Sequence, residues 1–122
     1  MILENKIRLL VRNIISEGFN DHSEIIDVID GIKIRKIESD YVSQKYPVWN
    51  DYLGSHHYGK ESSHIPKDEI WISDKVLDRD LDGVIQHEVI ERAIMRALQK
   101  FYDMTPEESW EIGHNISKKL GF

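Results

Sequence analysis

The clearest helical pattern in this chain spans residues 81–102, with the sequence LDGVIQHEVIERAIMRALQKFY. Its apolar side chains recur at the spacing of one helix face, within about 60° of His87 on a helical wheel. They are Val84, Ile90, Ile94, Leu98 and Phe101. At about 100° per residue, His87 and Glu91 lie one turn apart on the same face. The pattern predicts a long helix that directs an imidazole and a carboxylate into its own apolar stripe.

A strand and a second helix flank this pattern. Residues 69–73, EIWIS, alternate as a strand does and place Ile70 and Ile72 on one face. Residues 105–108, TPEE, combine a threonine cap, a proline at the first helical position and a glutamate that completes a capping box. Gly121 stands where such a helix ends. The sequence therefore predicts a strand, the long helix and a C-terminal helix in succession.

The N-terminal part of the chain predicts a helix followed by a hairpin. Apolar residues recur at helical spacing over residues 7–15, and Gly18 marks the expected end of that helix. Residues 24–38 carry β-branched side chains on both sides of Asp30-Gly31, which is the strongest short-range signal for a hairpin turn. We expect two antiparallel strands here.

Residues 39–68 lose this periodicity and are rich in aromatic residues. They also hold His56, His57 and His64. So long a stretch without regular structure is unusual in a compact domain, and indicates either a functional loop or an element that the pattern does not reveal. The alternative interpretation is a loop pinned by its aromatic side chains, with the histidines as ordinary solvated residues.

These elements describe a single α+β domain over residues 1–122. It comprises a helix and a hairpin (1–38), an aromatic and histidine-rich loop (39–68), and the strand, long helix and C-terminal helix (69–122). We expect a small antiparallel sheet packed with the three helices.

Charge and composition exclude several classes of function. The 16 Lys and Arg residues against 22 Asp and Glu give a net charge of −6, which disfavours nucleic acid as a partner. The chain has no cysteine, so disulfides, thiolate ligands and cysteine nucleophiles are excluded. The apolar runs are too short to cross a bilayer. Because residues 1–6 lack the pattern of an export signal, we expect a cytoplasmic protein without membrane contact.

The segment HEVIE at residues 87–91 carries the chemistry of the chain. A buried carboxylate without a partner costs roughly several kcal/mol, so Glu91 on an apolar face requires a cation or a metal ion. Glu88 points about 100° away from His87, at the edge of the stripe. A carboxylate in that place reaches a metal-bound water without being a ligand.

This motif resembles the HExxH motif of the zincin family of zinc peptidases, with Glu91 in the place of the second histidine. It is also similar to the HExxE motif of small prokaryotic and viral proteins that carry a further histidine on a C-terminal helix. The likeness covers residues 70–121. It implies that His87, Glu91 and His114 bind the metal ion and that Glu88 is the general base.

The ligand set of two histidines and one glutamate suits a catalytic zinc ion that keeps its fourth position for water. Ferrous iron accepts the same set and is the alternative metal. The resemblance also implies that an edge strand before the helix, here residues 69–73, lines the substrate cleft, and that the substrate is a peptide or protein. We therefore expect a minimal zinc-dependent peptidase or amidohydrolase.

Two other interpretations of the motif stay open. His87 and Glu91 at spacing i, i+4 can simply hydrogen-bond each other, while Glu88 pairs with Arg92. The protein is then a non-catalytic interaction module, with a structural metal ion or a buried His–Glu pair. A metal-dependent nuclease or phosphoesterase is the second alternative.

The third ligand is also open at this point. The last helix is expected to bury its apolar side chains, Ile112, Ile116 and Leu120, and His114 lies about 160° from the middle of that face. The alternative third ligands are the loop histidines, His56, His57 and His64.

Residues 78–83, DRDLDG, match the first half of a calcium-binding loop. The twelfth position of such a loop should be a glutamate and is Val89 here. Aspartates at the start of a helix are better explained by the free backbone N–H groups and the helix dipole. We therefore do not expect a Ca²⁺ site.

Overall fold

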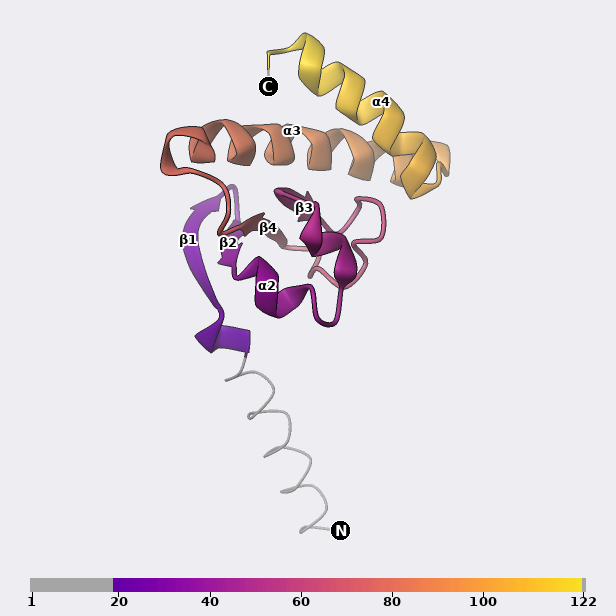
Figure 1. The fold of residues 1–122 in the computed structure, drawn as a ribbon. Coiled ribbons are helices and arrows are strands. Elements are labelled where there is room, and N and C mark those ends of the chain that lie inside the picture. The colour runs from indigo at the N-terminus through magenta and orange to yellow at the C-terminus, as the bar shows by residue number, and fades with distance from the viewer. Residues whose placement is uncertain (1–18, 122) are drawn as a thin grey trace, which may run out of the picture.

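The computed structural model describes residues 19–121 and contains a four-stranded sheet followed by two long helices (Figure 1). The α+β class expected from the sequence is confirmed. The helix predicted over residues 7–15, with its end at Gly18, lies outside the described residues. Within residues 19–121, no helix combines the length and the apolar character needed to cross a membrane.

The predicted hairpin is formed by β1 (Ser23–Ile29) and β2 (Ile32–Ile37), which pair antiparallel. Asp30 and Gly31 connect the two strands with φ angles of 50° and 80°. Positive φ at both central residues is the requirement of a type I′ turn, which explains the Asp-Gly sequence. The hairpin prediction is confirmed.

The second predicted strand is β4 (Glu69–Ser73), and it lies inside a sheet with the order β1-β2-β4-β3. β2 and β4 run parallel, so the sheet is mixed and not antiparallel throughout as expected. The cause is the long connection between them, because residues 38–68 cross from the end of β2 back to the start of β4.

The irregular segment contains three short elements that its sequence did not reveal. They are α2 (Ser39–Val42), the 3-10 helix η1 (Pro47–Asn50) and β3 (Gly54–His56). β3 pairs antiparallel with β4 and is an outer strand of the described sheet. The edge strand beside the long helix is therefore β3. The prediction that residues 69–73 form this edge strand is wrong, because β4 lies between β2 and β3.

The two long helices are α3 (Asp78–Tyr102) and α4 (Pro106–Lys119). Because α3 begins at Asp78, residues 78–83 form its first turns and do not fold as a calcium loop. α4 begins with the predicted capping box, in which Thr105 and Glu108 each bond the other's backbone N–H. These reciprocal bonds satisfy two of the free N–H groups at the helix start.

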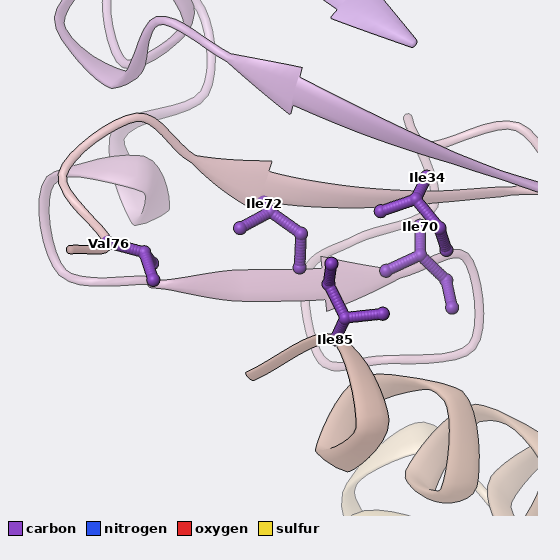
Figure 2. Packing of buried hydrophobic residues seen from close by; sticks show 5 residues of the cluster. All are labelled: Ile34, Ile70, Ile72, Val76 and Ile85. Carbon is purple, nitrogen blue, oxygen red and sulfur yellow. The ribbon is translucent and has the colours of Figure 1, made fainter. Parts of the chain in front are cut away.

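The molecule is layered, with α3 across one face of the sheet, α4 on α3, and α2 below the opposite face (Figure 1). One cluster of buried aliphatic residues joins the sheet to α3: Ile34, Ile70, Ile72, Val76 and Ile85 (Figure 2). A second cluster covers the other face of the sheet: Ile37, Val42, Trp49, Ile65 and Trp71. Full burial of such a side chain stabilises the fold by roughly 1.5–3 kcal/mol, so β4, which supplies both clusters, fixes α3 above the sheet.

Candidate metal centre

The buried residues of α3 are Ile85, Glu88, Glu91 and Met95. They follow one another in steps of one helix turn and so lie along one face. Glu88 is therefore on the buried face, whereas the predicted apolar stripe is not the centre of that face, because Val84, Ile90, Ile94 and Leu98 are only partly buried. The stripe also ends before its predicted last member, since Phe101 is 71% exposed. α3 packs on the sheet and on α4 at once, so its buried face does not coincide with the centre of its apolar side chains.

His87 and Glu91 contact each other, as their spacing predicts. The distance from His87 Nε2 to Glu91 Oε2 is 2.9 Å. Glu88 does not pair with Arg92, whose guanidinium donates to the carbonyl of Lys67 at 2.7 Å. Of the two side-chain pairs expected if the motif is only structural, the pair His87–Glu91 is observed and the pair Glu88–Arg92 is not.

α4 brings His114 to the same carboxylate. Nδ1 of His114 lies 3.4 Å from Oε2 of Glu91, and its ring lies 5.3 Å from the ring of His87. Gly113 allows this approach, because a β-carbon there would lie 3.0 Å from Cγ of Met95 and 3.7 Å from Cγ of Glu91. The close approach of the two helices at Gly113 places the next residue, His114, beside α3.

The face of α4 that meets α3 is lined by small residues: Ser109, Gly113 and Ser117. The prediction that Ile112, Ile116 and Leu120 are the buried face is wrong, because they are 38%, 39% and 60% exposed. Small side chains let the two helix backbones approach closely, and this contact leaves no apolar periodicity in the sequence.

β3 contributes His56, whose side chain is fully buried. Nε2 of His56 lies 3.4 Å from Oε1 of Glu91 and 4.0 Å from Oε2 of Glu88. Gly54, on the same strand, permits this contact, because a β-carbon there would lie 3.0 Å from Cγ of Glu88. The strand and α3 therefore meet at the two carboxylates.

The other two loop histidines lie elsewhere. His57 donates from Nδ1 to the carbonyl of Ile65 at 2.8 Å. His64 accepts a hydrogen bond at Nε2 from the indole of Trp49 at 3.0 Å and stacks on Tyr46. Of the three alternatives to His114, the structure brings His56 to the cluster.

Burial controls the protonation of these groups. It raises the pKa of Glu88 well above the ordinary carboxyl value, and the nearby charge of Glu91 raises it further. It lowers the pKa of His56. Burial also acts to raise the pKa of Glu91, but the imidazoles of His56, His87 and His114 outweigh it and hold that pKa below its ordinary value. Without metal, Glu91 is thus the ionised carboxylate, while Glu88 favours its protonated form and His56 its neutral form.

Two overlapping sets of three side chains have the spacing of metal ligands. We call His87, Glu91 and His114 the outer group, and His56, Glu88 and Glu91 the inner group. Within each group, the ligand atoms lie within 4.8 Å of one another. Imidazoles and carboxylates bind zinc and other divalent transition metals. The structure therefore shows a buried His/Glu cluster that can bind a metal ion.

A cleft of about 320 Å³ opens over the outer group. Glu88 and Glu91 line it together with both histidines of that group and with Ser55 of β3. On the α4 side, Trp110 stacks on His114 and the ammonium group of Lys60 lies 4.0 Å from the Trp110 ring. The outer group is therefore reached from solvent through a cleft between the edge strand and α4.

The motif on α3 did not identify His56, which entered only as one of three loop histidines. His56 reaches the cluster only through tertiary structure, because its position depends on the pairing of β3 with β4. A three-residue strand is too short for its alternation to be recognised in sequence.

Comparisons of the chain with protein-family models, with curated proteins and with solved structures give no match.

Proposed function

We propose that the protein is a divalent-metal-dependent hydrolase that uses water to cleave peptide or amide bonds. The observation that carries this proposal is the convergence of His87, Glu91 and His114 from two helices beneath a cleft that Glu88 also lines. Three protein ligands with access to solvent leave a coordination position for water, which distinguishes a catalytic from a structural zinc site.

The outer group would hold the metal ion through two imidazole nitrogens and one carboxylate oxygen. Zinc is the metal we expect, and ferrous iron is the alternative, because both accept this ligand set. A zinc ion in such a site lowers the pKa of its bound water to about 7. His87 and His114 are partly exposed, so the cleft gives both the ion and the substrate access.

Glu88 is the proposed general base. It lines the same cleft, and burial raises the pKa of its carboxyl group. A raised pKa makes a carboxylate a stronger base, which can accept a proton from water and return it to the leaving group. The HExxH resemblance assigns the same role to the glutamate at this position of the motif.

The proposed substrate is an extended segment of a peptide or protein. β3 is an outer strand of the described sheet and borders the cleft through Gly54 and Ser55. An edge strand can bind an extended peptide by main-chain hydrogen bonds, which places the peptide beside the next element of the structure. Here that element is α3, with the outer group.

Metal content tests the site. We expect about one tightly bound equivalent of zinc or iron in the wild-type protein as purified, before any zinc is added, and a loss of it in His87→Ala and in His114→Ala, because each removes one of three ligands. Elemental mass spectrometry on protein purified without chelator or affinity histidines measures this. His57→Ala is the matched control, since His57 lies outside both groups. A wild-type protein that takes up no metal when zinc is offered would overturn the proposal.

Glu88→Gln tests the reaction. The amide keeps the shape of the side chain but cannot accept a proton, so we expect hydrolysis of labelled casein or a mixed peptide library to fall by about 10²-fold or more. At one equivalent of zinc, the ion of the outer group should remain bound. If zinc raises the melting temperature of the wild type but no peptide is cleaved, the protein is instead an interaction module with a structural metal ion.

A further inference from the structure

The inner group combines buried side chains with missing hydrogen bonds. Both ring nitrogens of His56 and Oε2 of Glu88 are buried and have no hydrogen-bond partner within residues 19–121. Buried polar side-chain atoms nearly always have a partner, and an unsatisfied one costs about 1–3 kcal/mol. Two of these atoms, Nε2 of His56 and Oε2 of Glu88, are neighbours at 4.0 Å and can share one partner that the described chain does not supply.

The spacing of these atoms fits a small cation. Nε2 of His56 lies 3.4 Å from Oε1 of Glu91 and 4.0 Å from Oε2 of Glu88. Neighbouring ligands of a tetrahedral ion bound at about 2.1 Å are roughly 3.4 Å apart. Glu91 also supplies a negative charge, and Glu88 supplies a second one when a cation displaces its proton; a cation neutralises these charges and a water molecule does not.

Glu91 belongs to both groups but presents a different oxygen to each. Its Oε2 lies near His87 and His114, whereas its Oε1 lies near His56. A carboxylate can bind one metal ion with each oxygen. An ion in the outer group therefore leaves the ligand atoms of the inner group available.

We propose that the inner group, His56, Glu88 and Glu91, is a second divalent-cation site whose occupation suppresses hydrolysis. The inhibitory part rests on the proposed function, since Glu88 engaged by a cation can no longer accept the proton of the water. The inner site fills after the outer one, because His56 is fully buried whereas His87 and His114 are partly exposed. Glu88 and Glu91 line the cleft, so the second ion would reach the inner group through the cleft.

Zinc stoichiometry by equilibrium dialysis and elemental mass spectrometry tests the site without any activity measurement. We expect about two equivalents in the wild type and about one in both His56→Phe and Glu88→Gln, because each variant removes one inner ligand. Phenylalanine fills the buried volume of the imidazole, and glutamine preserves the shape of the glutamate. His57→Phe is the matched control and should keep two equivalents. Circular dichroism and melting in chelator show which variants are folded.

The outcomes separate the two proposals. One equivalent in the wild type that persists in His56→Phe overturns the inner site and leaves the proposed function standing. One equivalent that is lost in His56→Phe but kept in His114→Ala supports the inner site and overturns the outer one. No zinc in the wild type overturns both.

The inhibition by the second ion is tested by the rate of hydrolysis at one and at two equivalents of zinc. In the wild type, the hydrolysis rate at two equivalents of zinc should fall about tenfold or more below the rate at one equivalent. The same ratio within His56→Phe should be close to one, because its inner group lacks a ligand. A wild-type ratio close to one overturns the inhibitory role even where the second ion binds.

Discussion

Glu91 is the residue on which both ligand groups depend. Its oxygens lie 2.9 Å from His87, 3.4 Å from His114 and 3.4 Å from His56. Burial alone would favour the protonated form of such a carboxyl group. The three surrounding imidazoles reverse that preference, so that one negative charge is maintained at the centre of the cluster.

The raised pKa of Glu88 has a consequence for stability in the absence of metal. As the pH rises above the ordinary value of 4.5, the unfolded chain loses this proton first, while the folded protein retains it. The free energy of unfolding therefore falls with rising pH, by about 1.4 kcal/mol for each unit by which folding raises the pKa. We expect Glu88→Gln to remove this decline. Urea unfolding in chelator, at several pH values between about 5 and 8, measures the difference between the two proteins.

The same comparison has a clear negative outcome. If the difference in unfolding free energy between wild type and Glu88→Gln does not change over this pH range, Glu88 does not keep its proton in the folded state. His56 acts in the opposite direction, because its lowered pKa destabilises the protein at acidic pH, and it is present in both proteins.

For single residues, the sequence predicts a side-chain contact when both residues lie on the same element. The spacing of His87 and Glu91 determines their contact, because both lie on one helix. The burial of Glu88 was not predictable in this way. It depends on the approach of β3 at Gly54, and that strand is distant in the sequence.

The contact between α3 and α4 is the element that assembles the outer group. It is formed by small side chains on α4, with Gly113 against Met95 and Glu91. Gln99 reinforces it, because its amide donates to Ser109 Oγ at 2.9 Å and to the carbonyl of Tyr58 at 2.8 Å. The position of His114 is therefore set by helix packing.

Gly113→Ala should push the two helices apart. A β-carbon 3.0 Å from Met95 Cγ is too close, so we expect a loss of about 1–3 kcal/mol in unfolding free energy and weaker zinc binding as His114 moves. The matched control is Gly83→Ala on α3, where the added carbon meets nothing within 4 Å. That variant should be more stable by about 0.5–1 kcal/mol. Chemical unfolding and zinc titration measure both effects, and equal stability of the two variants would refute the packing argument.

Elements with a strong local signal were predictable from sequence. The Asp30-Gly31 turn defines β1 and β2, and the alternation of residues 69–73 defines β4. The sheet order was not predictable, since the parallel pairing of β2 with β4 depends on where a 31-residue crossover returns. β3 was missed because three residues contain too little of any pattern.

For the molecule as a whole, metal binding should appear as stability. Zinc at about 100 times its dissociation constant adds about 2.7 kcal/mol to the unfolding free energy, which raises the melting temperature of a domain of this size by roughly 10 °C. Glu91→Gln weakens both groups and should abolish the shift. Calcium should give little effect, because it prefers more oxygen ligands than the cluster offers. Scanning calorimetry measures the three cases, and an equal shift with calcium would argue against a His/Glu site.

The two ligand groups also differ in how far apart their members lie along the chain. Glu91 and His114 are 23 residues apart on a helical hairpin, and contacts of short sequence separation form early during folding. His56 reaches the same carboxylate only after the β2–β4 crossover has closed and β3 has docked on β4. We therefore expect a refolding chain to bring the side chains of the outer group together before those of the inner group, because His56 joins Glu91 only through contacts of longer sequence separation.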